Sequence, residues 1–279
     1  MKTELTKEQI NEVKELTNEV RKELGVYSDV PVADDLRSFL EKRGIIVCEQ
    51  VFSENIDAAI TIFEVSDDKM TFIGLNSALH YDEQLFALAH ELYHYLTKTG
   101  AAYEDKEDAV TERKADRFAA ELLLPSDVLS KNIDGVDLNK ESINRVWRII
   151  ARIQNKWWLP YRAIVNRLNE EGYISELRYD ELFKSEHRDS TMGYGRILYS
   201  VNKIIFQLLN SVIATNSISD NVVELTIQNF EDGIISEEEF IDSLDLFGKD
   251  PADFGFEIQA INDDEEMREF FVDGESDES

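Results

Sequence analysis

Two histidines four residues apart give this chain its clearest chemical signal. They belong to the segment His90-Glu91-Leu92-Tyr93-His94, an HExxH motif within a stretch that has helical periodicity. Residues four apart lie on one face of a helix, so both imidazoles can bind one metal ion. Glu91 is turned about 100° away from His90 and can take a proton from a water molecule that the metal polarises. The motif therefore indicates a zinc hydrolase.

Chance is the alternative explanation for this motif, and the composition of the chain weighs against it. Only four of the 279 residues are histidines, so an accidental HExxH has odds on the order of one in a hundred. The segment from 84 to 98 also carries an apolar stripe with helical spacing, formed by Leu85, Leu88, Ala89, Leu92 and Leu96. We expect a helix that ends near Gly100 and holds both histidines beside a buried face.

A catalytic zinc ion normally takes three protein ligands and keeps one position open. The extended metzincin pattern fails, because the positions where it requires Gly and His hold Thr97 and Gly100. A second helical segment, which stops at Pro125, carries Glu112 and Asp116 four residues apart. Glu112 is a candidate third ligand, and Asp116 is a candidate acceptor for the outer N–H of a ligand histidine. The spacing alone leaves open that the two acids form a solvated surface pair.

These two blocks together resemble the ImmA/IrrE family of metallopeptidases. The resemblance is carried by Ala87-Leu-Ala-His-Glu-Leu-Tyr-His-Tyr-Leu96, followed by Glu112-x-x-Ala-Asp-x-Phe-Ala-Ala-Glu-Leu-Leu-Leu-Pro125. It covers about half of the chain with specific motifs and the next region more loosely. The family usually has Met before the proline, where this chain has Leu124, a change that conserves side-chain volume.

The resemblance implies a site and a fold. It implies that Zn²⁺ is bound by His90, His94 and Glu112, that Glu91 is the general base, and that Asp116 orients a ligand histidine. The implied enzyme is a zinc metalloendopeptidase of gluzincin type. Its fold class would be α+β, with a zincin-like core of a small antiparallel sheet and active-site helices, followed by an all-helical C-terminal region.

The pattern before the motif agrees with an α+β core. Helices are expected over 6–24 and 32–43, and strands over 45–51, 58–65 and 70–76. In zincins, an edge strand ahead of the active-site helix receives the substrate peptide as an additional strand. We expect Met70–Asn76 in this role because of its position, with an ordinary central strand as the alternative.

Residues 131–185 are expected to form a helical module after a peptidase domain over 1–130, and the family resemblance gives this module a helix-turn-helix character. Residues 139–168 contain seven basic side chains and one acid, Glu141; the bases are Lys140, Arg145, Arg148, Arg152, Lys156, Arg162 and Arg167. A basic helix pair can bind nucleic acid, although an ordinary solvated helix face is the more frequent explanation.

The remaining residues, 186–279, are expected to form an acidic helical domain with a disordered C-terminal tail, because a block of like charges repels itself. The net charge of −29 disfavours an enzyme that acts on nucleic acid and favours basic partners. The family supplies such a partner, since its members resemble anti-repressors that act on helix-turn-helix transcriptional repressors, whose DNA-binding domains are basic.

Three further observations concern location. The chain has no apolar run long enough for a transmembrane helix, no apolar core of a signal peptide, and a single cysteine, Cys48. A cytoplasmic protein is the default expectation. The sequence thus predicts a zinc-dependent endopeptidase that cleaves a helix-turn-helix repressor. The alternatives are a non-proteolytic anti-repressor that zinc merely stabilises, and a DNA-binding regulator that uses residues 139–168.

Overall fold

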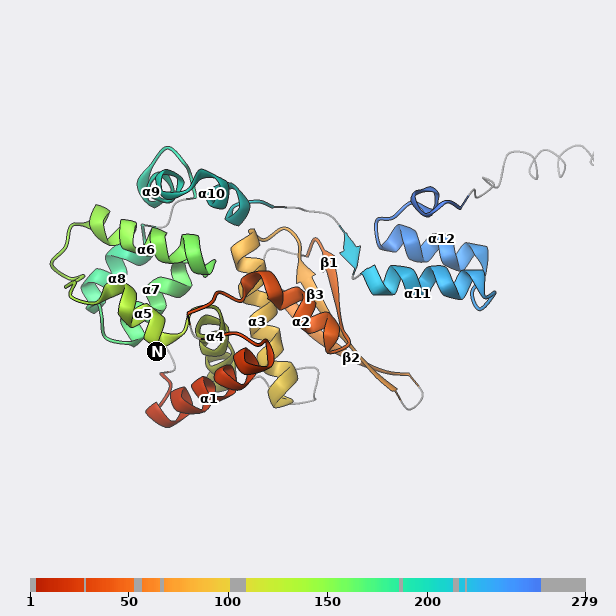
Figure 1. Cartoon of the computed structure of the whole chain (residues 1–279), viewed down its shortest axis with the longest axis horizontal. Helices are drawn as coiled ribbons and strands as arrows, with labels where there is room; N and C mark the ends of the chain where they lie inside the picture. The colour runs from red at the N-terminus through yellow and green to blue at the C-terminus, as the bar shows by residue number, and fades with distance from the viewer. Residues whose placement is uncertain are drawn as a thin grey trace, which may run out of the picture. The chain divides into compact units, whose positions relative to one another are not determined.

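The structure is a computed structural model that describes residues 4–27, 29–52, 57–65, 68–100, 109–185, 188–212, 216–218 and 220–256; side chains of 59–70 and 221 are not described. The elements are drawn in Figure 1. The chain divides into two compact units, Met1–Val222 and Val223–Ser279. The expected boundaries near 130 and 185 stay predictions, and the acidic tail lies outside the described residues.

The first unit contains a mixed β-sheet. Among the described residues its strand order is β2-β3-β1-β4, with β1 (Ile45–Gln50), β2 (Ala58–Val65), β3 (Asp68–Asn76) and β4 (Ser217–Ile218). The pairs β2–β3 and β1–β4 are antiparallel, whereas β1 and β3 are parallel. The α+β class is confirmed, but the sheet is not purely antiparallel, because the β2–β3 hairpin folds β3 back against β1. Its short fourth strand comes from the region that was expected to be all helical.

The expectation that Met70–Asn76 forms an edge strand is wrong. Strand β3 pairs on one side with β2 and on the other with β1. Its residues Ile73 and Leu75 are fully buried, as is typical of a central strand. Within the described part of the chain, β2 has no partner on its outer side and is therefore an edge strand.

Four helices build the rest of the zincin-like core: α1 (Lys7–Glu23), α2 (Leu36–Lys42), α3 (Tyr81–Thr97) and α4 (Ala109–Leu123). A short 3₁₀ turn, Ala33–Asp35, precedes α2. Helix α3 packs against β2 and β3 on one side and against α4 on the other (Figure 1). The predicted apolar stripe explains this position, because Leu85, Leu88 and Leu92 of α3 are fully buried, together with Phe118 and Leu122 of α4.

The helices that follow are α5 (Ser126–Ile133), α6 (Ile143–Trp157), α7 (Tyr161–Glu170), α8 (Glu176–Phe183), α9 (Gly193–Val201) and α10 (Lys203–Leu209). Helix α6 ends as expected before Leu159-Pro160, with Trp158 in the left-handed region at φ 54°. Helix α11 (Asp220–Glu231) reaches into the second unit, which also contains α12 (Glu237–Leu246) and the 3₁₀ turn Pro251–Phe254. No helix within the described ranges combines the length and apolarity that a membrane span requires.

A group of charged side chains joins α4 to α7, and we call it the ion network: the buried Arg117, Glu121 and Arg167 and the partly buried Glu171. Arg117 contacts Glu121 at 3.1 Å and Glu171 at 2.9 Å. Arg167 contacts the same two carboxylates at 3.0 and 2.7 Å and donates to the Leu124 carbonyl at 3.0 Å. Glu121 also accepts a hydrogen bond from the Ser126 backbone N–H at the start of α5. The ion network therefore fixes α4 relative to the helices that follow it.

Candidate metal centre

Helix α3 presents two imidazole nitrogens to one point. His90 and His94 lie one turn apart, and their Nε2 atoms are 3.2 Å from each other. Both side chains are largely buried, with 18% of His90 and 5% of His94 exposed. They lie beside the buried stripe of the helix, as the sequence indicated. This close approach of two nitrogen lone pairs is favourable only if a cation or a proton lies between them.

Helix α4 adds a carboxylate to the same point. The Glu112 oxygens lie 3.2 Å from His90 Nε2 and 3.4 Å from His94 Nε2. A tetrahedral Zn²⁺ site with bonds of about 2.0–2.1 Å separates its ligand atoms by about 3.3 Å. The two Nε2 atoms are separated by such a distance, and each of them lies at such a distance from a different oxygen of Glu112. One ligand atom from each of His90, His94 and Glu112 lies within 4.8 Å of the other two, so the three residues make up a group able to hold a metal ion. The residues present therefore fit the cation that the HExxH motif implies.

The electrostatics of the site also favour a cation. Burial lowers the pKa of His90, but hydrogen bonds to Asp116 and Glu112 outweigh burial and raise this pKa to about 10. A hydrogen bond from His90 lowers the pKa of Glu112. Burial and the neighbouring charge of His90 lower the pKa of His94. In the absence of metal, a proton is thus stabilised where a metal ion would be bound.

The outer nitrogens of both histidines have partners. His90 Nδ1 lies 3.2 Å from Asp116 Oδ1, as the spacing suggested, and Arg113 donates to the other oxygen of Asp116 at 3.3 Å. His94 Nδ1 lies 3.2 Å from the Thr99 hydroxyl. Sequence reasoning missed Thr99, because no motif spacing marks it and it follows the end of the helix.

Glu91, the predicted general base, is buried at 8% exposure. Its negative charge is among the causes that raise the pKa of His90. Three tyrosines were available from the sequence to stabilise an oxyanion: Tyr93, Tyr95 and Tyr161. The hydroxyl of Tyr161 donates to the Leu182 carbonyl at 2.9 Å, so that contact occupies its proton.

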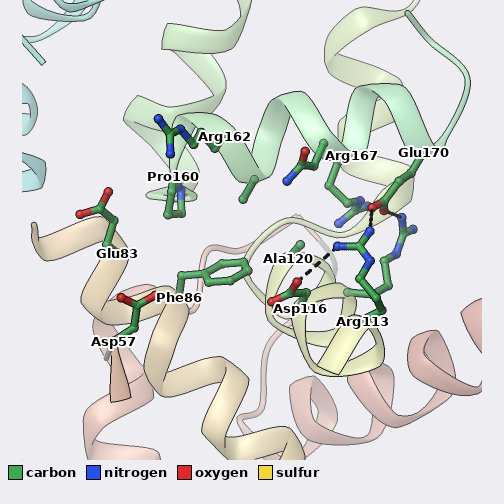
Figure 2. Close-up of a pocket in the computed structure, with 13 residues that line it drawn as sticks. Asp57, Glu83, Phe86, Arg113, Asp116, Ala120, Pro160, Arg162, Arg167 and Glu170 are labelled. Atoms are coloured by element: carbon green, nitrogen blue, oxygen red, sulfur yellow. Dashed lines mark hydrogen bonds and ion pairs between the residues drawn. The ribbon is translucent and has the colours of Figure 1, made fainter. Parts of the chain in front are cut away.

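A cavity of about 190 Å³ opens beside Asp116. In Figure 2, Asp57, Glu83 and Phe86 lie on one side of it, and Asp116, Arg113 and Glu170 on the other. Asp57 directly precedes the edge strand β2. Burial and the negative charge of Glu83 raise the pKa of Asp57. The cavity therefore connects the edge strand with the carboxylate that contacts His90.

The α+β fold and the cluster of two imidazoles and one carboxylate on α3 and α4 define a metallopeptidase-like domain. Residues 41–169 match the family model described as the IrrE N-terminal-like domain, Peptidase M78. This domain belongs to the ImmA/IrrE family, as the two sequence blocks suggested. The matched range includes β1, β2, β3, α3, α4 and every residue of the cluster. No curated protein matches the chain.

Proposed function

We propose that the chain is a zinc-dependent endopeptidase. The observation that carries this proposal is the convergence of His90, His94 and Glu112: the two Nε2 atoms lie 3.2 Å apart, and the Glu112 carboxylate approaches them at 3.2 and 3.4 Å, one oxygen to each imidazole. Two nitrogens and one carboxylate oxygen are a frequent donor set for catalytic zinc, and they leave room for a fourth ligand. The match to a peptidase family supports a protein substrate.

Each residue of the site has a part in the proposed reaction. A bound Zn²⁺ would polarise a water molecule and the scissile carbonyl. Glu91 accepts the proton of the attacking water and returns a proton to the leaving amine. Asp116 accepts a hydrogen bond from His90 Nδ1–H, which leaves the Nε2 lone pair of neutral His90 available to a metal ion.

The proposed substrate is a basic protein, and a helix-turn-helix repressor is the candidate. The net charge of −29 favours encounter with a basic partner. The carboxylate of Asp57 lines the cavity next to the first residue of β2. The outer edge of β2 would receive a substrate segment as an additional strand. Asp57 would then lie near the basic side chains of that segment.

The test combines metal analysis with three variants of the full chain. We expect one zinc per chain in the wild type and in Glu91→Gln, and none in Glu112→Ala. Cleavage of a proteome-derived peptide library, read by mass spectrometry, should fall by about 10²–10⁴-fold in Glu91→Gln, because a general base contributes that much. Glu12→Gln is the matched control, since Glu12 is an exposed residue of α1 that pairs with Lys114 on the protein surface. Undiminished cleavage by Glu91→Gln would exclude the proposed mechanism.

Two other functions make different predictions. If the protein is a non-proteolytic anti-repressor, the Glu91→Gln variant should still relieve repression fully. A DNA-binding regulator would need the basic residues of 139–168, and several of these side chains already form ion pairs within the protein. Arg167 is 1% exposed within the ion network, and Lys140 and Arg145 pair with Asp137 and Glu141. The observations therefore favour the peptidase.

A further inference from the structure

The segment after α3 folds back onto His94. The helix ends at Thr97, and Lys98 takes the left-handed conformation at φ 56°. This turn brings the Thr99 hydroxyl to 3.2 Å from His94 Nδ1. The same hydroxyl lies 2.7 Å from the Thr97 hydroxyl, which in turn lies 2.8 Å from the Tyr93 carbonyl oxygen. Two hydroxyls thus connect the outer nitrogen of His94 with a backbone carbonyl.

The direction of each hydrogen bond follows from counting protons. A carbonyl oxygen only accepts, so the single proton of the Thr97 hydroxyl goes to Tyr93. The contact between the two threonines must then use the proton of Thr99. With that proton committed, Thr99 Oγ1 can only accept from His94. His94 Nδ1 therefore carries a hydrogen, and neutral His94 has its lone pair on Nε2, the atom that faces Glu112.

We propose that Thr97 and Thr99 are positioning residues that form a hydroxyl relay and fix the tautomer of His94 before a metal binds. Neutral histidine in water prefers to carry its proton on Nε2, and a protonated Nε2 cannot bind a metal ion. The relay reverses that preference in the folded protein. This inference rests on the proposed metal site and names how one ligand of that site is prepared.

Gly100 completes the arrangement. Its φ is 88°, and a Cβ added there would lie 3.0 Å from His94 Nδ1 and 3.3 Å from its Cγ. The backbone of Gly100 therefore lies directly against the imidazole ring. The hydroxyl of Thr99 fixes the ring through a hydrogen bond, while Gly100 limits its tilt. Thr97 and Gly100, which occupy the two positions where the metzincin pattern fails, thus both help to orient the His94 ring.

His90 is prepared by a different group. Its Nδ1 contacts the Asp116 carboxylate, which accepts a hydrogen bond without needing any further residue to direct a proton. The hydroxyl of Thr99, by contrast, can donate or accept, and only Thr97 makes it an acceptor. Loss of Thr97 should therefore affect His94 even though Thr97 does not touch the ring.

The test reads the tautomer in the metal-free protein. Long-range ¹H–¹⁵N correlation spectra of ¹⁵N-histidine-labelled full-length chain at neutral pH report which nitrogen of His94 carries the hydrogen. We expect Nδ1–H in the wild type and in Thr99→Ser, and a shift toward Nε2–H in Thr99→Val and Thr97→Val. Zinc affinity, measured by competition with a chromophoric chelator, should fall by about 10–100-fold in the two valine variants and recover in Thr99→Ser.

Thr17→Val is the matched control, because Thr17 makes the same hydroxyl-to-carbonyl hydrogen bond within α1, to Val13 at 2.8 Å. It should leave both readouts unchanged. An Nε2–H tautomer in the wild type would overturn the proposal, as would an unchanged tautomer in whichever valine variants fold. The tautomer is read without metal or substrate, so failure of the peptidase proposal would show in the Glu91→Gln test and not here.

Discussion

Helix α4 carries two groups of charged side chains that are held in different ways. Its first half brings Glu112 and Asp116 to the histidines of α3, and its second half brings Arg117 and Glu121 into the ion network. The Glu112 carboxylate contacts two imidazoles and, within the described part of the chain, no lysine or arginine. In the ion network, two arginines face two glutamates.

The difference separates a scaffold from a binding site. Burial raises the pKa of Glu121, but Arg167 and Arg117 outweigh burial and lower it. The charges of the ion network are thus neutralised by the protein itself. Glu112 is 39% exposed, and its partners are the imidazoles of His90 and His94. A carboxylate that faces imidazoles, as Glu112 does, can take up a cation from solution, whereas a balanced group of opposite charges holds helices together.

The largest effect on stability should come from the ion network. Arg167→Met leaves the buried Glu121 and the partly buried Glu171 with one arginine and deprives the Leu124 carbonyl of its donor. We expect a loss of about 3–5 kcal/mol in the free energy of unfolding, because removing one partner of a buried pair leaves an uncompensated charge. Urea unfolding measures it.

The matched control is Arg152→Met on the exposed face of α6, which should change stability by less than about 0.5 kcal/mol. The folded fraction of Arg167→Met should still bind zinc. A stability equal to that of the wild type would show that the ion network does not act as a scaffold.

The two groups should also differ in their response to pH. The pKa of His90 rises from 6.5 to about 10 in the folded, metal-free protein. Its contribution to stability is therefore fully present below pH 6.5 and is lost as pH rises through about 10. Because the pKa of Glu121 is lowered, Glu121 stays ionised above neutral pH and does not make stability depend on pH there. We expect the metal-free protein to become less stable between pH 7 and 9.5.

Urea unfolding with a chelator, at both pH values, measures this loss. His90→Gln is the reference variant, because it keeps every other titrating group and should remove the slope assigned to His90. Saturating zinc should also remove it, since the metal displaces the proton. Equal slopes in the wild type and His90→Gln would contradict the assignment.

The sequence predicted those features that depend on local spacing. The pairing of His90 with His94 follows from one helical turn, and the helices α3 and α4 follow from their apolar stripes. The approach of Glu112 depends on how α3 packs against α4, so spacing alone left it open and the family resemblance decided it. In the same way, strand order depends on pairing between distant segments. The central place of β3, and the addition of β4 from residue 217, therefore could not be read from the pattern.

Thr99 shows the same limit at the scale of one side chain. Its contact with His94 requires the left-handed turn at Lys98, a conformation that a lysine rarely adopts. Apart from Gly100, which was interpreted as the residue that ends the helix, no residue type in the segment indicated this turn. The site was thus predictable as a motif, while the groups that orient the second histidine were not.

The smallest expected effect is that of a glycine substitution, and it distinguishes close packing against a ligand of the candidate metal site from backbone strain elsewhere. Gly100 and Gly135 both have positive φ, 88° and 72°, so alanine at either position should cost about 1–2 kcal/mol in stability. Only at Gly100 does the added Cβ meet a side chain, His94 Nδ1 at 3.0 Å; nothing lies within 4 Å at Gly135. Gly100→Ala should therefore also weaken zinc binding by about tenfold, measured by chelator competition, whereas Gly135→Ala should leave it unchanged. Equal zinc affinities in the two variants would mean that the His94 ring tolerates displacement, and the contact with Gly100 would then matter for folding alone.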